Sequence, residues 1–278
     1  MVGFKVNKQA LGHVTIRKIE KGQITFITLN RPEKLNAMTC EMMEELYTAL
    51  GMVEEDKETR VVILSGEGKN FCAGADLAAN ALGVGGREWN SKLLENQRLF
   101  SRCIEKVASI PHPVIAAIHG ACAGGGMSLA LAADIRVAAK NMRMSAAFLN
   151  IGLSGCELGT SFYLPRLVGL SHASEILMTG ATVTADRALQ INLVNYVTEN
   201  TDEMDIKAVS IAKRMLKASP LGLKQTKLQL RAASESTSLK ATIHAEDVGQ
   251  VLCLNDEETS KIVQQKCEPF IAKLRAKI

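Results

Sequence analysis

Three consecutive glycines at positions 124–126 stand between an apolar run and an Ala/Leu-rich run. Glycines let the main chain approach a ligand closely, and the first N–H groups of a helix have no intrahelical partner. Such donors favour negative charge, so the segment could bind a developing oxyanion or a phosphate. It could equally be a tight strand-to-helix turn that needs glycine for packing alone. The triplet matches neither the P-loop nor the GxGxxG pattern.

A second turn of this kind occurs earlier in the chain, in the segment NFCAGADLAANA at residues 70–81. It follows the expected strand 61–66 and combines small residues with a bend at Gly74, which offers another exposed N–H near Ala75. Two such turns from parallel units can point two amides at one carbonyl oxygen. That arrangement is an oxyanion hole, in which the loss of one donor costs about 3 kcal/mol of barrier.

Other polar side chains give weaker signals. His119 ends the expected strand before the glycines and could reach the mouth of the site, although structural histidines at strand edges are commoner. Ser128 could hydrogen-bond a ligand or a water, but it has no His and Asp at a recognisable spacing, so serine hydrolase chemistry is not expected. The seven cysteines contain no CxxC pair and are interpreted as reduced thiols, with Cys72 and Cys122 as small wall residues. No metal site is expected.

Composition and charge narrow the class of protein. The chain has 278 residues, 47% of them hydrophobic, which is enough for one substantial core. A net charge of +4 spread over interspersed acids and bases predicts neither nucleic-acid binding nor a membrane patch. Residues 1–18 lack the apolar run of a signal peptide and no run is long enough to cross a bilayer. A cytoplasmic location is expected, or the mitochondrial matrix or peroxisome in a eukaryote.

Strands and helices alternate along the first two hundred residues without a long linker. The pattern predicts a hairpin over 14–30, strands at 61–66, 113–120 and 135–139, and helices over 34–56, 89–108 and 127–133. The repeat indicates an α/β fold of stacked ββα units rather than one doubly wound sheet. Residues 1–200 are expected to form this core. Residues 201–278 read as consecutive amphipathic helices, a C-terminal helical module.

Five segments together resemble the enoyl-CoA hydratase/isomerase (crotonase) family in order and spacing, over roughly residues 14 to 275. They are ITLNRPEKLNAM, FCAGADL, PVIAAIHGACAGGGMSLALAADIRVAA, IGLSGCELGTSFYLPRLVG and LMTGATVTADRALQINLVNYV. The resemblance implies a crotonase-like spiral whose C-terminal helices assemble homotrimers or hexamers. It also implies an acyl-CoA thioester as substrate, with coenzyme A entering as part of that substrate and no separate cofactor.

The resemblance also assigns site residues. It places the two oxyanion-hole amides at Ala75 and Gly125. The residues that it implies along the adenine and pantetheine path are Lys34, Leu35, Ala37, Ala73 and Asp76. Lys34 could screen phosphate charge, although a lysine after RPE is at least as often a solvated surface residue.

The resemblance leaves the chemistry less complete than the fold. Hydratases of the family use two glutamates, and Ser128 and Phe148 stand at those positions here, so ordinary hydration is not expected. Glu157 matches a position where dienoyl-CoA isomerases of the family place an acid. With Phe148, Leu153 and Phe162 it is expected in an apolar acyl pocket, where burial raises its pKa towards that of a general base. A first-turn acid favoured by the helix dipole is the alternative.

Three functions remain open at this point. The first is an isomerase that moves a proton on an acyl-CoA with Glu157 as base. The second is an acyl-CoA-binding protein that keeps the channel and the assembly surface without the chemistry. The third is an atypical hydratase or thioester hydrolase in which water is positioned without the usual glutamates. The irregular segment 78–95 is expected to wall the acyl pocket.

Overall fold

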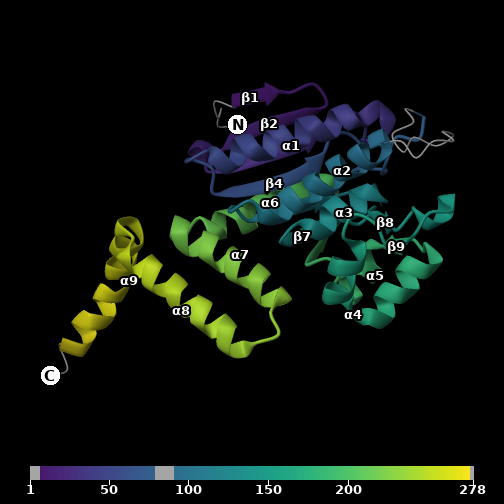
Figure 1. Ribbon diagram of the computed structural model, residues 1–278. Coiled ribbons are helices and arrows are strands. Elements are labelled where there is room, and N and C mark those ends of the chain that lie inside the picture. Colours follow the sequence, from purple (N-terminus) through teal and green to yellow (C-terminus); the bar gives the residue numbers. More distant parts are fainter. Residues whose placement is uncertain (1–6, 79–90, 276–278) are drawn as a thin grey trace.

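Two sheets make up the β structure of residues 7–78 and 91–275, which the computed structural model describes (Figure 1). The larger sheet has the order β1-β2-β3-β4-β5-β7-β10 and the smaller β6-β8-β9. The larger consists of β1 (Asn7–Ala10), β2 (Val14–Ile19), β3 (Ile24–Leu29), β4 (Val61–Gly66), β5 (Val114–Ile118), β7 (Ile135–Ala139) and β10 (Tyr196–Thr198). The smaller consists of β6 (Ala121–Ala123), β8 (Arg143–Ser145) and β9 (Val183–Thr184).

The larger sheet begins with antiparallel pairs and continues as a parallel sheet. β2 and β3 pair antiparallel, from Val14 opposite Leu29 to Ile19 opposite Ile24, which confirms the predicted hairpin. From β3 onwards, β4, β5, β7 and β10 add in parallel. Parallel neighbours need a crossover connection, and helices supply it here. The structure is the predicted crotonase-like α/β fold.

The helices follow the strands in the predicted order. They are α1 (Cys40–Glu55), α2 (Ser91–Ser109), α3 (Gly125–Ala132), α4 (Thr160–Thr179), α5 (Ala185–Gln190), α6 (Thr201–Met215), α7 (Pro220–Glu235), α8 (Leu239–Asn255) and α9 (Glu257–Arg275). Three short 3₁₀ turns are η1 (Glu20–Gly22), η2 (Pro32–Lys34) and η3 (Leu149–Ile151). Within the described ranges, no helix is both long enough and apolar enough for a bilayer crossing.

Helices cover both faces of the large sheet. Successive side chains of a strand alternate between the two faces, so one strand contributes to two cores. Ile27 and Leu29 of β3 pack in the core shared with α1, α2, α3 and α4. Ile24 and Phe26 of the same strand point the other way, into a second core that α6 covers with Met204. α6 therefore packs directly on the sheet, although it begins at the predicted module boundary. That boundary stays a prediction.

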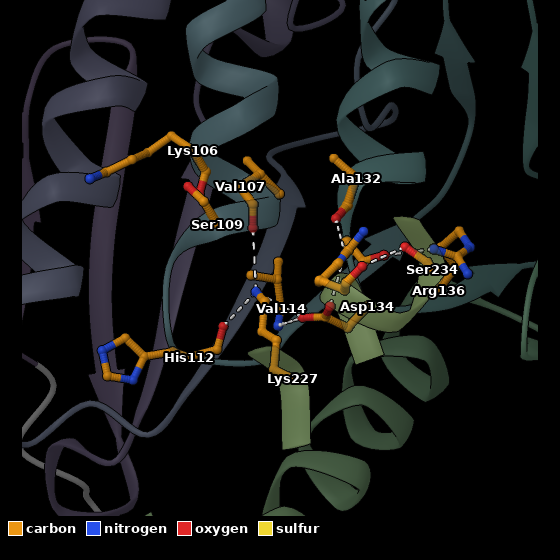
Figure 2. Close-up of polar contacts among 12 residues, drawn as sticks. Lys106, Val107, Ser109, His112, Val114, Ala132, Asp134, Arg136, Lys227 and Ser234 are labelled. Atoms are coloured by element: carbon orange, nitrogen blue, oxygen red, sulfur yellow. Dashed lines mark hydrogen bonds and ion pairs between the residues drawn. The ribbon is translucent and has the colours of Figure 1, made fainter. Parts of the chain in front are cut away.

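A partly buried ion-pair network joins α7 to the core (Figure 2). Lys227 Nζ lies 3.0 Å from Asp134 Oδ2 and donates to the carbonyl oxygen of His112 at 2.9 Å. Arg231 reaches the other oxygen of Asp134 at 2.9 Å, and the N–H of Val114 donates to Oδ2. Beyond this anchor, α8 and α9 project away from the sheets (Figure 1).

Candidate active site

The glycine triplet connects β6 to α3, and its first and last members are fixed for different reasons. Gly124 has φ 53° and ψ −123°, a conformation that side-chain-bearing residues rarely adopt. A Cβ on Gly126 would lie 2.4 Å from the carbonyl oxygen of Cys72. The triplet therefore lets α3 begin directly against the turn that contains Gly74. The sequence offered two interpretations of this motif, a turn that needs glycine for packing and a turn that presents a main-chain donor, and the structure is compatible with both.

The second turn presents Ala75 to the same place. The N–H of Met38 donates to Gly74 O at 2.8 Å, and the N–H of Asp76 donates to Met38 O at 2.9 Å. This parallel bridge uses the residues on both sides of Ala75, so the N–H of Ala75 points away from Met38. A Cβ on Gly74, which has φ 98°, would lie 2.9 Å from the carbonyl oxygen of Ala123. The two turns are therefore in contact.

One small cavity collects four of the residues that the sequence singled out: Ala75, Gly125, Phe148 and Glu157. Its other lining residues are Met38, Leu93, Gln97, Phe100 and Leu158. No hydrogen bond within the described part of the chain uses the N–H of Ala75 or of Gly125. Two residues whose main-chain N–H groups have no partner in the described part of the chain thus line one mainly apolar cavity. Residues 79–90 of the expected wall lie outside the described residues, while Leu93 does line the cavity.

Glu157 lies on the turn between η3 and α4. Its Oε1 accepts a hydrogen bond from Gln97 Nε2 at 2.8 Å, whereas Oε2 is buried without a partner among the described residues. Burial raises the pKa of Glu157 above its ordinary value, and the hydrogen bond from Gln97 opposes that rise. The predicted direction of the shift is therefore found in the structure. The carboxyl group is favoured in its neutral form more than an exposed glutamate would be.

The apolar surroundings of Glu157 differ in part from the expected set. Phe148 lines the cavity, but Leu153 and Phe162 are not among the described residues that do so. Leu153 is 42% exposed on the outer side of its turn. The ring of Phe162 instead packs under the guanidinium of Arg166, at 3.7 Å from its carbon. Phe100 of α2 and Leu158, the neighbour of Glu157 in its turn, line the cavity instead.

The predicted adenine and pantetheine residues lie together in two loops beside the cavity, though none of them is among its described lining residues. The N–H of Ala73 donates to the carbonyl oxygen of Leu35 at 3.1 Å, which joins the loops. Lys34 and Leu35 are exposed and Ala37 is half-buried. Asp76 is buried and pairs with Arg31, a residue that the sequence analysis missed.

Ser128 and His119 lie near the glycine turn but outside the described cavity lining. The hydroxyl of Ser128 is buried without a partner among the described residues, and its binding role stays a prediction. His119 Nε2 lies 3.0 Å from the carbonyl oxygen of Gly68, and burial lowers the pKa of this histidine. Both features suit a neutral, buried histidine.

The buried thiols beside the turns are not poised for chemistry. Cys72 and Cys122 are both fully buried and pair across one isolated bridge. Burial raises the pKa of Cys72 to about 12, so its thiolate is scarce near neutral pH. In the part of the chain that the structure describes, no group of three His, Cys, Asp or Glu side chains is arranged to hold a metal ion.

A spiral of parallel strands and helices, with two main-chain turns meeting at an apolar cavity, defines a crotonase-fold protein. The enoyl-CoA hydratase/isomerase family model matches residues 19–268, and the chain belongs to this family. A solved enoyl-CoA hydratase from Bacillus anthracis superposes with a TM-score of 0.85 at 28% identity, covering 93% of this chain and 97% of that one.

Curated relatives carry names from both sides of the family. A Mycobacterium leprae protein named "Probable enoyl-CoA hydratase" is 39% identical over 231 residues, covering 82% of this chain and 78% of its own. An Arabidopsis thaliana peroxisomal Delta(3,5)-Delta(2,4)-dienoyl-CoA isomerase is 29% identical over 268 residues, covering 93% and 96%. The chain is therefore a member of an enzyme family, and these names do not favour isomerisation over hydration.

Proposed function

We propose that this protein binds an acyl-CoA thioester and isomerises an enoyl- or dienoyl-CoA, with Glu157 as the base. The observation that supports it is one cavity in which Glu157 lies with the free amides of Ala75 and Gly125. Glu157 is the one carboxylate among the described residues lining that cavity. A single base facing an oxyanion hole suffices for a proton shift along one carbon framework.

In the proposed reaction, Glu157 takes a proton from the carbon next to the thioester carbonyl. The electron pair of that C–H bond forms a carbon–carbon double bond, and negative charge moves to the thioester oxygen. The amides of Ala75 and Gly125 stabilise that oxygen through hydrogen bonds. Glu157 then returns the same proton to a carbon farther along the conjugated chain. No water, metal or redox partner is consumed, and the proton balance is zero.

Hydration is the second candidate, and the name of the Mycobacterium leprae relative favours it. Against it stands the set of side chains around the cavity. The resemblance implies that a hydratase of this family uses two glutamates, and it matches their positions to Phe148, which lines the cavity, and to Ser128, whose hydroxyl is buried outside the described lining. Neither a phenyl ring nor a hydroxyl can act as a carboxylate base.

We also propose a homotrimer or hexamer, in line with the resemblance. Large apolar side chains on the C-terminal helices are exposed in the single chain, including Leu239 at 75% and Leu230 at 68%. Burial of such side chains in an assembly is favourable by about 25 cal/mol per Å². Light scattering coupled to size-exclusion chromatography tests the proposal, and a monomer at micromolar concentration would contradict it.

The function is tested with purified protein on trans-2-enoyl-CoA, cis-3-enoyl-CoA and 3,5-dienoyl-CoA. We expect isomerisation of one of the last two, and a loss of about 10²–10⁴-fold in kcat for Glu157→Gln with acyl-CoA affinity retained. Glu105→Gln on the exposed side of α2 is the matched control and should keep wild-type activity. Hydration of the trans-2 substrate that survives in Glu157→Gln would support the hydratase. No turnover of any substrate would support a binding protein.

A further inference from the structure

Gln97 is a polar side chain on the cavity face of α2. It lies one turn from Leu93 and one turn from Phe100, and all three line the cavity. Residues at these spacings share one face of a helix. Leu93 and Phe100 make this helix face apolar, and Gln97 is the polar side chain between them. A polar amide on such a face needs a hydrogen-bond partner, and that partner is Glu157.

We propose that Gln97 is a positioning residue, which holds Glu157 through Oε1 and leaves Oε2 as the atom that takes up and releases the proton. The inference rests on the proposed function of Glu157 as base and adds which atom of it reacts. Gln97 touches Glu157 rather than the reacting carbon, so its effect on the reaction is indirect.

The argument starts from the donor character of the amide nitrogen. The NH₂ group of glutamine only donates, so the carboxyl oxygen that it contacts at 2.8 Å is an acceptor. With the amide in this orientation, a protonated Glu157 carries its proton on Oε2. Oε2 is buried without a partner in the described chain, and a purely structural role would leave that polar atom unpaired at a cost in free energy. A proton-transfer role, with a substrate C–H group placed against Oε2, accounts for the oxygen being kept unpaired.

Among the described lining residues, no other charged side chain competes for Glu157. Gln97 and Glu157 are the two polar side chains among the described residues that line it. On the surrounding elements, the nearby titratable groups are exposed or already paired: Glu95 and Arg98 on α2, Cys156 beside Glu157, and Asp76 with Arg31. Gln97 is thus the described side chain that hydrogen-bonds this carboxyl group, and its hydrogen bond favours the ionised form against the larger opposing effect of burial.

Two substitutions separate positioning from packing. Gln97→Met keeps the length of the side chain but removes the donor, so the ionised carboxylate loses support. We expect the acidic limb of kcat/KM to move to higher pH, with activity on that limb about tenfold below wild type and KM nearly unchanged. Gln97→Glu places a second carboxyl against Oε1, and like charges should move the limb further in the same direction. Gln190→Met, an exposed site on α5, is the matched control.

A second measurement does not depend on turnover. In protein labelled with carbon-13 at the glutamate carboxyls, the signal of Glu157 is identified by its absence in Glu157→Gln, and its titration midpoint is followed by NMR. We expect the midpoint to rise from wild type to Gln97→Met to Gln97→Glu. Equal midpoints and equal pH profiles would overturn the positioning role while leaving the isomerase proposal intact. The expected order without any isomerase activity would uphold the contact and overturn the function.

Discussion

The guanidinium of Arg31 forms a charged hydrogen-bonded pair with the carboxylate of Asp76, and both of its terminal nitrogens donate to the same oxygen within 3.2 Å. Both side chains are almost wholly buried, and Arg31 also donates to the carbonyl oxygen of Ala37 at 2.5 Å. The pair therefore fastens the loop before α1 to the turn that presents Ala75. A long-range ion pair thus fixes the position of one proposed oxyanion donor.

Loss of the Arg31–Asp76 ion pair should lower the stability of the fold. For Arg31→Met we expect a loss of about 2 kcal/mol in the free energy of unfolding, because a buried charge-assisted hydrogen bond is removed. Arg31→Lys should recover little of it, since an ammonium cannot reproduce the fork of contacts. Urea titration measures both. Lys140→Met, which breaks an exposed pair with Asp186, should cost under about 1 kcal/mol. Equal losses at the two sites would contradict the role of Arg31.

Two helical glycines should respond to alanine with opposite signs. A Cβ on Gly126 meets the backbone of Cys72 at 2.4 Å, so Gly126→Ala should cost about 1–3 kcal/mol and push α3 away from the Ala75 turn. A Cβ on Gly51 in α1 meets nothing within 4 Å, so Gly51→Ala should stabilise by up to about 1 kcal/mol. Thermal unfolding of both variants checks the signs, and kcat should fall only in Gly126→Ala. A stable, fully active Gly126→Ala would refute the contact between the turns.

Local patterns predict the central strands and the helices between them, because periodicity and glycine placement are local signals, whereas the short strands β1, β6, β8, β9 and β10 have no such pattern. The strand 135–139 was predicted to the residue, and the resemblance placed the glycine turn and Ala75 together. The helix predicted over 34–56 begins only at Cys40, because Leu35 and Asn36 adopt left-handed φ angles of 55° and 54°. Leu35 gives no signal for this conformation, whereas Asn36 is of a type that tolerates it and Thr39 is the N-cap of α1, so the later start had local signals that the periodicity outweighed.

Periodicity and glycine placement do not predict contacts between segments that are distant in the sequence. Gln97 looked like one more polar residue of an amphipathic helix, and only the fold shows that it faces Glu157 across 60 positions of sequence. A signal existed in the apolar neighbours at Leu93 and Phe100, which mark its helix face as buried. The pairing of Arg31 with Asp76 had no such signal. Charge partners chosen by topology cannot be read from spacing along the chain.

The anchor of α7 depends on one carboxylate shared by two cations (Figure 2). Asp134→Asn leaves Lys227, which is 7% exposed, and Arg231 without their partner. Because such a change strands a buried charge, we expect a loss of about 3–5 kcal/mol in the free energy of unfolding. Glu257→Gln, which removes a carboxylate from the exposed pair with Lys261, should cost under about 1 kcal/mol.

Hydrogen exchange measures where the Asp134→Asn loss falls. Amides of α7 should lose protection before those of the β strands, since the substituted contact lies between that helix and the core. Equal protection of α7 in wild type and variant would show that other contacts hold the helix. If the amides of α7 and of the β strands lost protection together, the anchor would belong to the same cooperative unfolding unit as the sheet.

Glu157 should also contribute to the pH dependence of the stability of the folded protein. Its pKa in the folded protein is raised above the ordinary 4.5 by burial. The folded state therefore binds this proton more tightly than the unfolded state, a contribution that is complete below pH 4.5 and is lost as pH rises through the folded pKa. Glu157→Gln removes the cost of ionising a buried carboxyl, so its melting temperature should exceed that of wild type at pH 8. Differential scanning calorimetry from pH 4 to pH 8 should show the gap closing on acidification, whereas a constant gap would mean that Glu157 is ordinarily solvated.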